Sequence, residues 1–205
     1  MKEAAQPSGG PLRRLAPLLD RLQEVTGRQV AMLLALFVVA TILLLIVGPG
    51  RAAQDLAGPL LPLPNRAGTA IAEQLPRFLE ALGPSGRGTY LTYLVLDLPY
   101  AGLFALTFSS AVAAATARYD KVPRDLRNLA LVPLAAGACQ FLTDLGILTL
   151  TLRSVDGPNA LATLVGWLSA SWLALTNITV ILAAAALFGL AHHGMRAAEG
   201  KAEGK

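Results

Sequence analysis

The sequence predicts an all-α integral membrane protein built on a bundle of four transmembrane helices. Hydrophobic residues make up 54% of the chain and charged residues 15%, whereas soluble domains carry about 25% charged residues. Four apolar runs are also long enough to cross a bilayer, which takes ~20 residues in a helix. For a chain of 205 residues, we therefore expect a single transmembrane domain over residues 1–205.

The four predicted spans differ in charge and in length. The first is uncharged and stops at Gly48-Pro49-Gly50, and the second contains Asp97 and Pro99 in an otherwise apolar stretch. The last run would measure ~46 Å as a straight helix, so we expect it to tilt, to bend or to begin above the membrane. The spans cover about residues 30–47, 90–115, 129–152 and 161–191.

Two flanking segments are amphipathic. Before the first span, apolar residues recur at helical spacing opposite charged ones, and the same pattern returns in the first loop. Pro76 can occupy the first turn of the second of these helices. Each segment is either an interfacial helix at the membrane surface or a helix packed on the bundle. Their apolar positions are Leu12, Leu15, Leu19, Leu22 and Val25, and then Leu75, Phe78, Leu79 and Leu82.

The other connections carry signals for irregular structure. Four prolines between residues 48 and 65 predict an irregular loop. The polar ends of the chain, 1–10 and 196–205, contain few residues that could bury apolar surface. We expect both ends to be disordered.

Lysine and arginine are distributed unevenly between the two sides of the predicted membrane. Twelve of the 17 lie before the first span, between the second and third spans, or after the fourth, and five lie in the other two loops. The positive-inside rule therefore predicts a multi-pass protein of the cell membrane with both termini cytoplasmic. The same distribution argues against nucleic-acid binding, because basic residues beside a span attract anionic lipid head groups.

The sequence contains few of the residue patterns that bind metals or cofactors. Its single cysteine, Cys139, excludes an intramolecular disulfide and a Cys-based metal site. No nucleotide-binding, zinc-binding or nucleophile-elbow motif is present. We therefore expect no cofactor and no metal site, and we assign no catalytic residue.

Two aspartates lie inside the predicted second and third spans. A charged side chain at the centre of a transmembrane helix costs ~2.5–3.5 kcal/mol on insertion scales, so such residues face a packed interior or a wet cavity. Asp97 and Asp144 lie about seven and eight residues from the outer ends of antiparallel spans, which places both ~10–12 Å below the outer surface. We therefore expect the two aspartates to share one layer.

Other polar side chains surround the two aspartates. On the second and third spans, residues three or four positions from each aspartate share its helical face. The fourth span adds the amide of Asn177. If Trp167 lies at the membrane interface, as expected, this amide lies ~15 Å deeper. Hydroxyl and amide groups can hydrogen-bond a carboxyl group. The predicted polar cluster, and candidate ligand-binding site, consists of Asp97, Asp144, Tyr93, Tyr100, Gln140, Thr143 and Asn177.

Three uses of this cluster stay open: a clamp between helices, a binding or catalytic cavity, and a path for a proton or solute. The leading function is non-enzymatic, either a structural or accessory subunit or a binder of a lipid-like ligand. The alternative is a membrane-embedded enzyme that acts on a lipid or isoprenoid with an aspartate as general acid or base. A small proton-linked transporter ranks third. The expected partners are membrane lipids, and either another membrane protein or a second copy of the chain.

Three stretches between about residues 80 and 183 carry a family resemblance: EALGPSGRGTYLTYLVLDLPYAGLFAL, LRNLALVPLAAGACQFLTDLGILTL and LATLVGWLSASWLALTNITVILA. The first contains a Gly-Arg-x-x-Tyr pattern ending at Tyr90, followed by Asp97. Through these stretches the chain resembles a family of small bacterial four-span membrane proteins with no established activity. In that family the third-span cluster is more acidic, and the position of Asn177 is often basic. The resemblance implies the four spans and a shared polar layer, and it implies no reaction.

Overall fold

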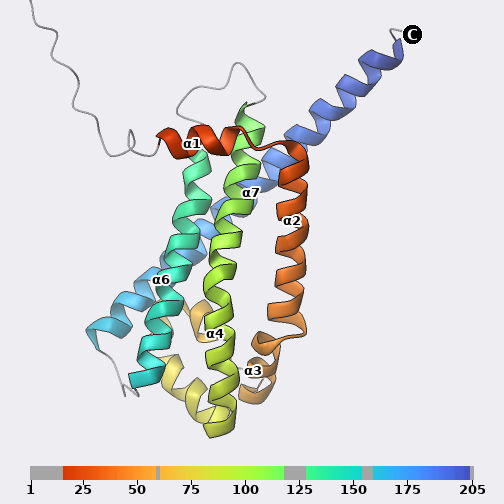
Figure 1. The fold of residues 1–205 in the computed structure, drawn as a ribbon. Helices are drawn as coiled ribbons and strands as arrows, with labels where there is room; N and C mark the ends of the chain where they lie inside the picture. Colours follow the sequence, from red (N-terminus) through yellow and green to blue (C-terminus); the bar gives the residue numbers. More distant parts are fainter. Residues whose placement is uncertain (1–15, 59–60, 118–127, 154–158, 204–205) are drawn as a thin grey trace, which may run out of the picture.

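The computed structural model describes residues 16–58, 61–117, 128–153 and 159–203. The elements within these ranges are all helices or helical turns, and most belong to long helices that run side by side (Figure 1). Four segments are long and apolar enough to cross a membrane: Gly27–Ala57, Gly68–Ala117, Asn128–Arg153 and Ala160–Gly189. The predicted all-α bundle with four spans is therefore confirmed, and it indicates a multi-pass membrane protein.

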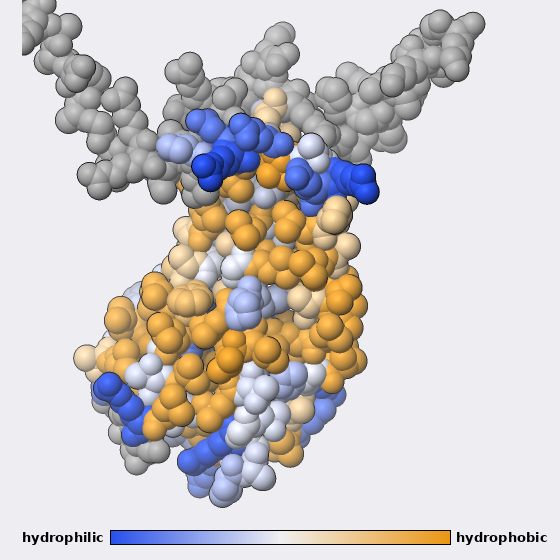
Figure 2. Space-filling view, in the orientation of Figure 1, coloured by the Kyte–Doolittle hydropathy of each residue, from blue (hydrophilic) through white to orange (hydrophobic). Residues whose placement is uncertain are grey.

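The surface has the layered polarity expected of such a protein. On the face shown in Figure 2, apolar side chains cover the middle of the bundle, and hydrophilic side chains gather at its two ends. One end carries α1 (Ala16–Gln23), and the opposite end carries α3 (Pro49–Ala57) (Figure 1). We call these the α1 end and the α3 end.

The amphipathic segment before the first span forms α1, which lies across one end of the bundle (Figure 1). Its Leu22 is buried in a cluster with Val112 and Ala130. The packing therefore favours the alternative in which this segment is a helix on the bundle. Leu12 and Leu15, from the same pattern, lie outside the described residues.

The first span begins at a side-chain cap and ends at an irregular turn. Thr26 and Gln29 form a capping box at the start of α2 (Gly27–Thr41). The helix then widens into a π-helical turn over Ile42–Ile46. It ends at Gly48, where a Cβ atom would lie 1.8 Å from the carbonyl oxygen of Leu43, so only glycine fits. The predicted irregular loop over 48–65 is wrong in its first half, since Pro49 starts α3 at its first turn.

The second span belongs to α4 (Ile71–Ala117), which is bent at Gly83. The backbone φ of Gly83 is +62°, a left-handed value that favours glycine. The limb before the bend contains the second amphipathic segment. Its Leu75 and Phe78 are buried in the main core beside Ile147, so this limb packs on the bundle as well.

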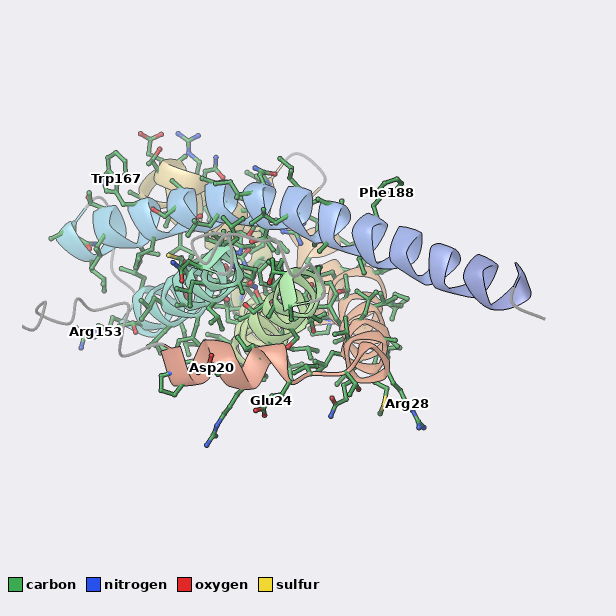
Figure 3. All side chains as sticks on the ribbon, turned by 90° about the horizontal axis from the view of Figure 1, so that it is seen from above. Asp20, Glu24, Arg28, Arg153, Trp167 and Phe188 are labelled. Atoms are coloured by element: carbon green, nitrogen blue, oxygen red, sulfur yellow. The ribbon has the colours of Figure 1, made fainter. Side chains whose placement is uncertain are left out.

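The third and fourth spans are α6 (Leu131–Arg153) and α7 (Ala160–Glu203). α4, α6 and α7 pack on one another, whereas α2 packs chiefly on α4. Of the three alternatives for the long last span (a tilt, a bend or a start above the membrane), the structure favours a tilt, because α7 crosses the bundle obliquely (Figure 1). Seen from above, Trp167 and Phe188 point away from the bundle (Figure 3). Of the ends that we expected to be disordered, 1–10 lies outside the described residues, and α7 continues as a helix to Glu203.

Candidate functional site

The centre of the site is Asn65, which lies in the segment between α3 and α4. Residues 61–70, here called the Asn65 segment, contain two short helical turns, Pro64–Arg66 and Gly68–Ala70. The segment packs against α4, α6 and α7. The side chain of Asn65 is only 1% exposed. The first loop thus returns into the bundle and supplies a buried amide at the level of the two aspartates.

Ser169 on α7 fixes the backbone of the Asn65 segment. Its hydroxyl donates to the carbonyl oxygen of Asn65 at 2.9 Å and accepts from the backbone N–H of Gly68 at 3.1 Å. Close packing supports these bonds: a Cβ on Gly166 would lie 3.2 Å from the Cα of Thr69. The backbone that carries Asn65 is therefore held by a buried side chain on another helix.

The amide nitrogen of Asn65 contacts both aspartates. It lies 3.0 Å from Oδ2 of Asp97, 3.2 Å from Oδ1 of Asp144 and 2.8 Å from the hydroxyl oxygen of Tyr93. An amide nitrogen carries two hydrogens, so the three acceptors share them. The expected shared layer of the two aspartates thus exists, and a residue from outside the predicted cluster links them.

Asp97 accepts hydrogen bonds on both of its carboxyl oxygens. Besides Asn65, the hydroxyl of Tyr93 donates to Oδ2 at 3.0 Å, and Nε2 of Gln140 donates to Oδ1 at 3.2 Å. Tyr93 lies one helical turn before Asp97 on α4, while Gln140 comes from α6. Asp97 is 1% exposed. This carboxyl group therefore ties α4, α6 and the Asn65 segment together.

Asp144 is as deeply buried as Asp97, but it has fewer partners. Its Oδ1 accepts from Asn65, while Oδ2 has no hydrogen-bond partner among the described residues. Two further oxygens of the cluster, Oδ1 of Asn65 and Oε1 of Gln140, are buried without a described partner as well. Buried polar atoms nearly always have a partner, which can be water, a proton-sharing group or a ligand. The cluster thus has free acceptor positions.

Three of the predicted residues lie outside this network. The hydroxyl of Tyr100 is 2.9 Å from Oγ1 of Thr41 on α2. Because the hydroxyl of Thr41 donates its proton to the carbonyl oxygen of Phe37, Tyr100 is the donor in this pair. Thr143 is buried but donates to the carbonyl oxygen of Cys139, on its own helix. Asn177 is exposed on α7. The structure therefore brings together Asp97, Asp144, Tyr93 and Gln140.

A cavity of about 390 Å³ adjoins the cluster. Its polar part is formed around Asp97 and Gln140, and its apolar part around the packed rings of Phe37, Phe104 and Phe108. We call it the amphipathic cavity. Its walls come from α2, the Asn65 segment, α4, α6 and α7, and they consist of Phe37, Leu45, Asn65, Arg66, Tyr93, Asp97, Tyr100, Phe104, Phe108, Gln140, Trp172, Leu173, Thr176, Asn177 and Val180.

Tyr100 separates the amphipathic cavity from a second, apolar cavity. The second cavity measures about 360 Å³ and lies between α2 and α4. Tyr100 lines both, and its ring stacks on Phe37 with the ring centres 5.3 Å apart. The walls of the second cavity are Ala40, Leu43, Leu44, Leu96, Pro99, Tyr100 and Leu103.

Several residues of the site were missed by reasoning from the sequence. Asn65 and Arg66 lie in a loop, and Trp172 and Thr176 lie on the face of α7 that lines the cavity. One available signal was the run LLPLPN, because three leucines in a loop indicate that the loop is buried. No group of three metal-binding side chains occurs among the described residues.

The chain was compared with models of protein families, with curated proteins and with solved structures, and none of them matches it.

Proposed function

We propose that this protein is a multi-pass protein of the cell membrane that binds a lipid-like amphiphile between α2 and α7. The observation that carries the proposal is the amphipathic cavity, which joins a polar part at Asp97 to an apolar part at Phe104 and Phe108. Along α4 the distance from Asp97 to Phe108 corresponds to ~16 Å of helix. A molecule with a polar head and an apolar tail matches a cavity that is polar at one end and apolar at the other.

The open side of the cavity supports access from the bilayer. Arg66, Asn177 and Val180 line the cavity and are exposed. α2 packs chiefly on α4, and its own outward face is apolar, with Met32 and Leu36 exposed. In a membrane, this side of the bundle faces acyl chains, so an apolar tail can enter from the side.

The charges of the loops support the orientation that goes with this proposal. Twelve of the 17 lysines and arginines fall, in the sequence, before the first span, between the second and third spans or after the fourth, and the positive-inside rule predicts that these segments, with both termini, are cytoplasmic. The α3 end and the Asn65 segment then belong to the outer half of the membrane. The head of the bound amphiphile accordingly lies in the outer leaflet.

A structural role of the polar cluster is compatible with this function. Asp97 and Asn65 connect three parts of the bundle, which is how buried polar side chains stabilise packed transmembrane helices. The cluster then forms the rigid floor of the cavity. An enzymatic use of Asp97 has less support, because both of its oxygens already accept hydrogen bonds from the protein.

Native mass spectrometry of the protein in mild detergent tests the proposal. We expect the wild type to retain an amphiphile through delipidation, and Thr176→Trp to lose it, because Thr176 lines the cavity and a bulky ring there fills it. Thr163→Trp is the matched control, since Thr163 is exposed on the same helix and does not line the cavity. Equal retention by Thr176→Trp and the wild type would contradict binding in this cavity.

A further inference from the structure

Of the described residues that line the amphipathic cavity, two are charged, and a ligand can reach one of them. Asp97 is 1% exposed, and both of its carboxyl oxygens already accept hydrogen bonds from the protein. Arg66 is exposed, and its side chain forms no hydrogen bond and no ion pair with the described residues. Arg66 therefore carries the charge that a molecule in this cavity can contact.

The positive charge of Arg66 acts on the polar part of the cavity. It interacts electrostatically with the side chains of Tyr93, Asp97 and Tyr100, and these three residues all line the cavity. Tyr93 and Asp97 also accept hydrogen bonds from Asn65, the residue before Arg66 in the chain. The guanidinium group is thus close to the polar part of the cavity while it stays accessible to a ligand.

A free guanidinium group favours an anionic ligand. It presents its N–H donors in one plane and binds a phosphate or a carboxylate through two parallel hydrogen bonds. Asp97 offers no equivalent site for a cationic ligand, because the protein already occupies both of its oxygens. In the proposed orientation, Arg66 also belongs to the outer half of the membrane, where an opposite charge stabilises an arginine.

We propose that the amphiphile in the cavity has an anionic head group, a phosphate or a carboxylate, that pairs with Arg66, while its apolar tail lies toward Phe104 and Phe108. This inference rests on the proposed function and specifies the charge of its ligand. An anionic phospholipid and a fatty acid both provide such an oxyanion. A choline phospholipid also has a phosphate, but its ammonium group adds a positive charge that Arg66 repels.

Competition between phospholipids with the same acyl chains tests the charge of the head group. The full-length protein in a neutral detergent is mixed with equal amounts of an anionic glycerol phospholipid and a choline phospholipid, and the retained lipid is counted by native mass spectrometry. We expect retention of the glycerol phospholipid to exceed that of the choline phospholipid by about fivefold, as for one arginine beside an anionic head group.

A second competition distinguishes the two sources of the oxyanion. A fatty acid with the same acyl chain replaces the glycerol phospholipid in the mixture with the choline phospholipid. If either anionic amphiphile exceeds the choline phospholipid, the inference is supported, and the amphiphile with the larger excess identifies the oxyanion as a phosphate or a carboxylate. If neither exceeds it, the inference is wrong.

Substitutions of Arg66 test whether this side chain carries the preference. Arg66→Gln removes the charge, so the anionic and choline phospholipids should be retained about equally, whereas Arg66→Lys keeps the charge and should keep a preference for the anion. Arg77→Gln is the matched control, because Arg77 is exposed on α4 before the bend and does not line the cavity. This variant should keep the preference of the wild type.

The possible results separate this inference from the proposed function. Equal retention of the anionic and choline amphiphiles by the wild type would overturn the inference and leave amphiphile binding intact. An equal loss of preference in Arg66→Gln and Arg77→Gln would also overturn it, because the preference would then follow net charge alone. If the wild type retained no amphiphile of any kind, both the proposed function and the inference would fail. Since the wild-type comparison needs no substitution, it holds even if a variant folds poorly.

Discussion

The side-chain amide of Asn65 donates a hydrogen bond of 3.0 Å to the carboxyl group of Asp97, which lies 32 residues later in the chain. The same nitrogen reaches Asp144 on another helix at 3.2 Å. One loop residue thus joins the two acids of the bundle. The Asn65 segment, the two aspartates and the adjoining cavity therefore form one structural unit. Substitutions can test the contribution of each of these parts separately.

Replacement of Asn65 should destabilise the bundle. Asn65→Ala removes the donor shared by Tyr93, Asp97 and Asp144, and with it the hydrogen bond that Oδ1 of Asp144 accepts. A buried polar group without a partner costs about 1–3 kcal/mol, so we expect a loss of unfolding free energy in that range. Unfolding by a denaturing detergent in mixed micelles measures it. Asn177→Ala is the control, because Asn177 is exposed and should change stability by less than about 0.5 kcal/mol.

The two aspartates should differ in their response to the same substitution. Asp97→Asn places an NH₂ group against donors, because both oxygens of Asp97 accept hydrogen bonds in the protein. Asp144→Asn can place its NH₂ group at the position of Oδ2, which has no described partner. We expect Asp97→Asn to lower the unfolding free energy by about 1–2 kcal/mol more than Asp144→Asn. Thermal unfolding of both variants in one detergent decides the order, and an equal loss would show that the described bonds do not govern stability.

Close packing of α4 on α6 makes Gly137 sensitive to a single methyl group. A Cβ there would lie 2.6 Å from Cβ of Ala105 and 2.8 Å from the carbonyl oxygen of Ala101, so the helices would have to move apart. Gly137→Ala should cost about 1–3 kcal/mol of unfolding free energy. At Gly102 on α4, a Cβ meets nothing within 4 Å. Gly102→Ala should be neutral or stabilising by up to about 1 kcal/mol, because alanine favours the helix. A similar cost for both substitutions in thermal unfolding would refute this account.

The hydrogen bond between Tyr100 and Thr41 should contribute to the attachment of α2. The two hydroxyl oxygens lie 2.9 Å apart, and they form a direct polar link between α4 and α2. Hydrogen bonds between transmembrane helices average ~0.6 kcal/mol, so Tyr100→Phe should cost about that much. A double-mutant cycle with Thr41→Val isolates the interaction, since the coupling energy should equal this loss. Additive losses would mean that the two hydroxyl groups do not interact.

The polar faces of the spans could be read from the sequence because helical spacing is a local property. Tyr93 and Asp97 are four residues apart, as are Gln140 and Asp144, so each pair had to lie on one face of its helix. The antiparallel order of neighbouring spans then placed the acids in one layer. Thr143 was wrongly expected to join them, because a threonine in a helix can also bond to its own backbone, as it does here to Cys139.

The sequence by itself determined the composition of the spans and their number, because the thickness of a bilayer and the rise of a helix set how many apolar residues a span needs. Only the tertiary structure decided which groups meet between the spans. The fold of residues 61–70, held by Ser169, carries Asn65 to the acids, and it depends on contacts with residues about a hundred positions later. No local pattern encodes such a contact, since it exists only once α7 has packed beside the loop.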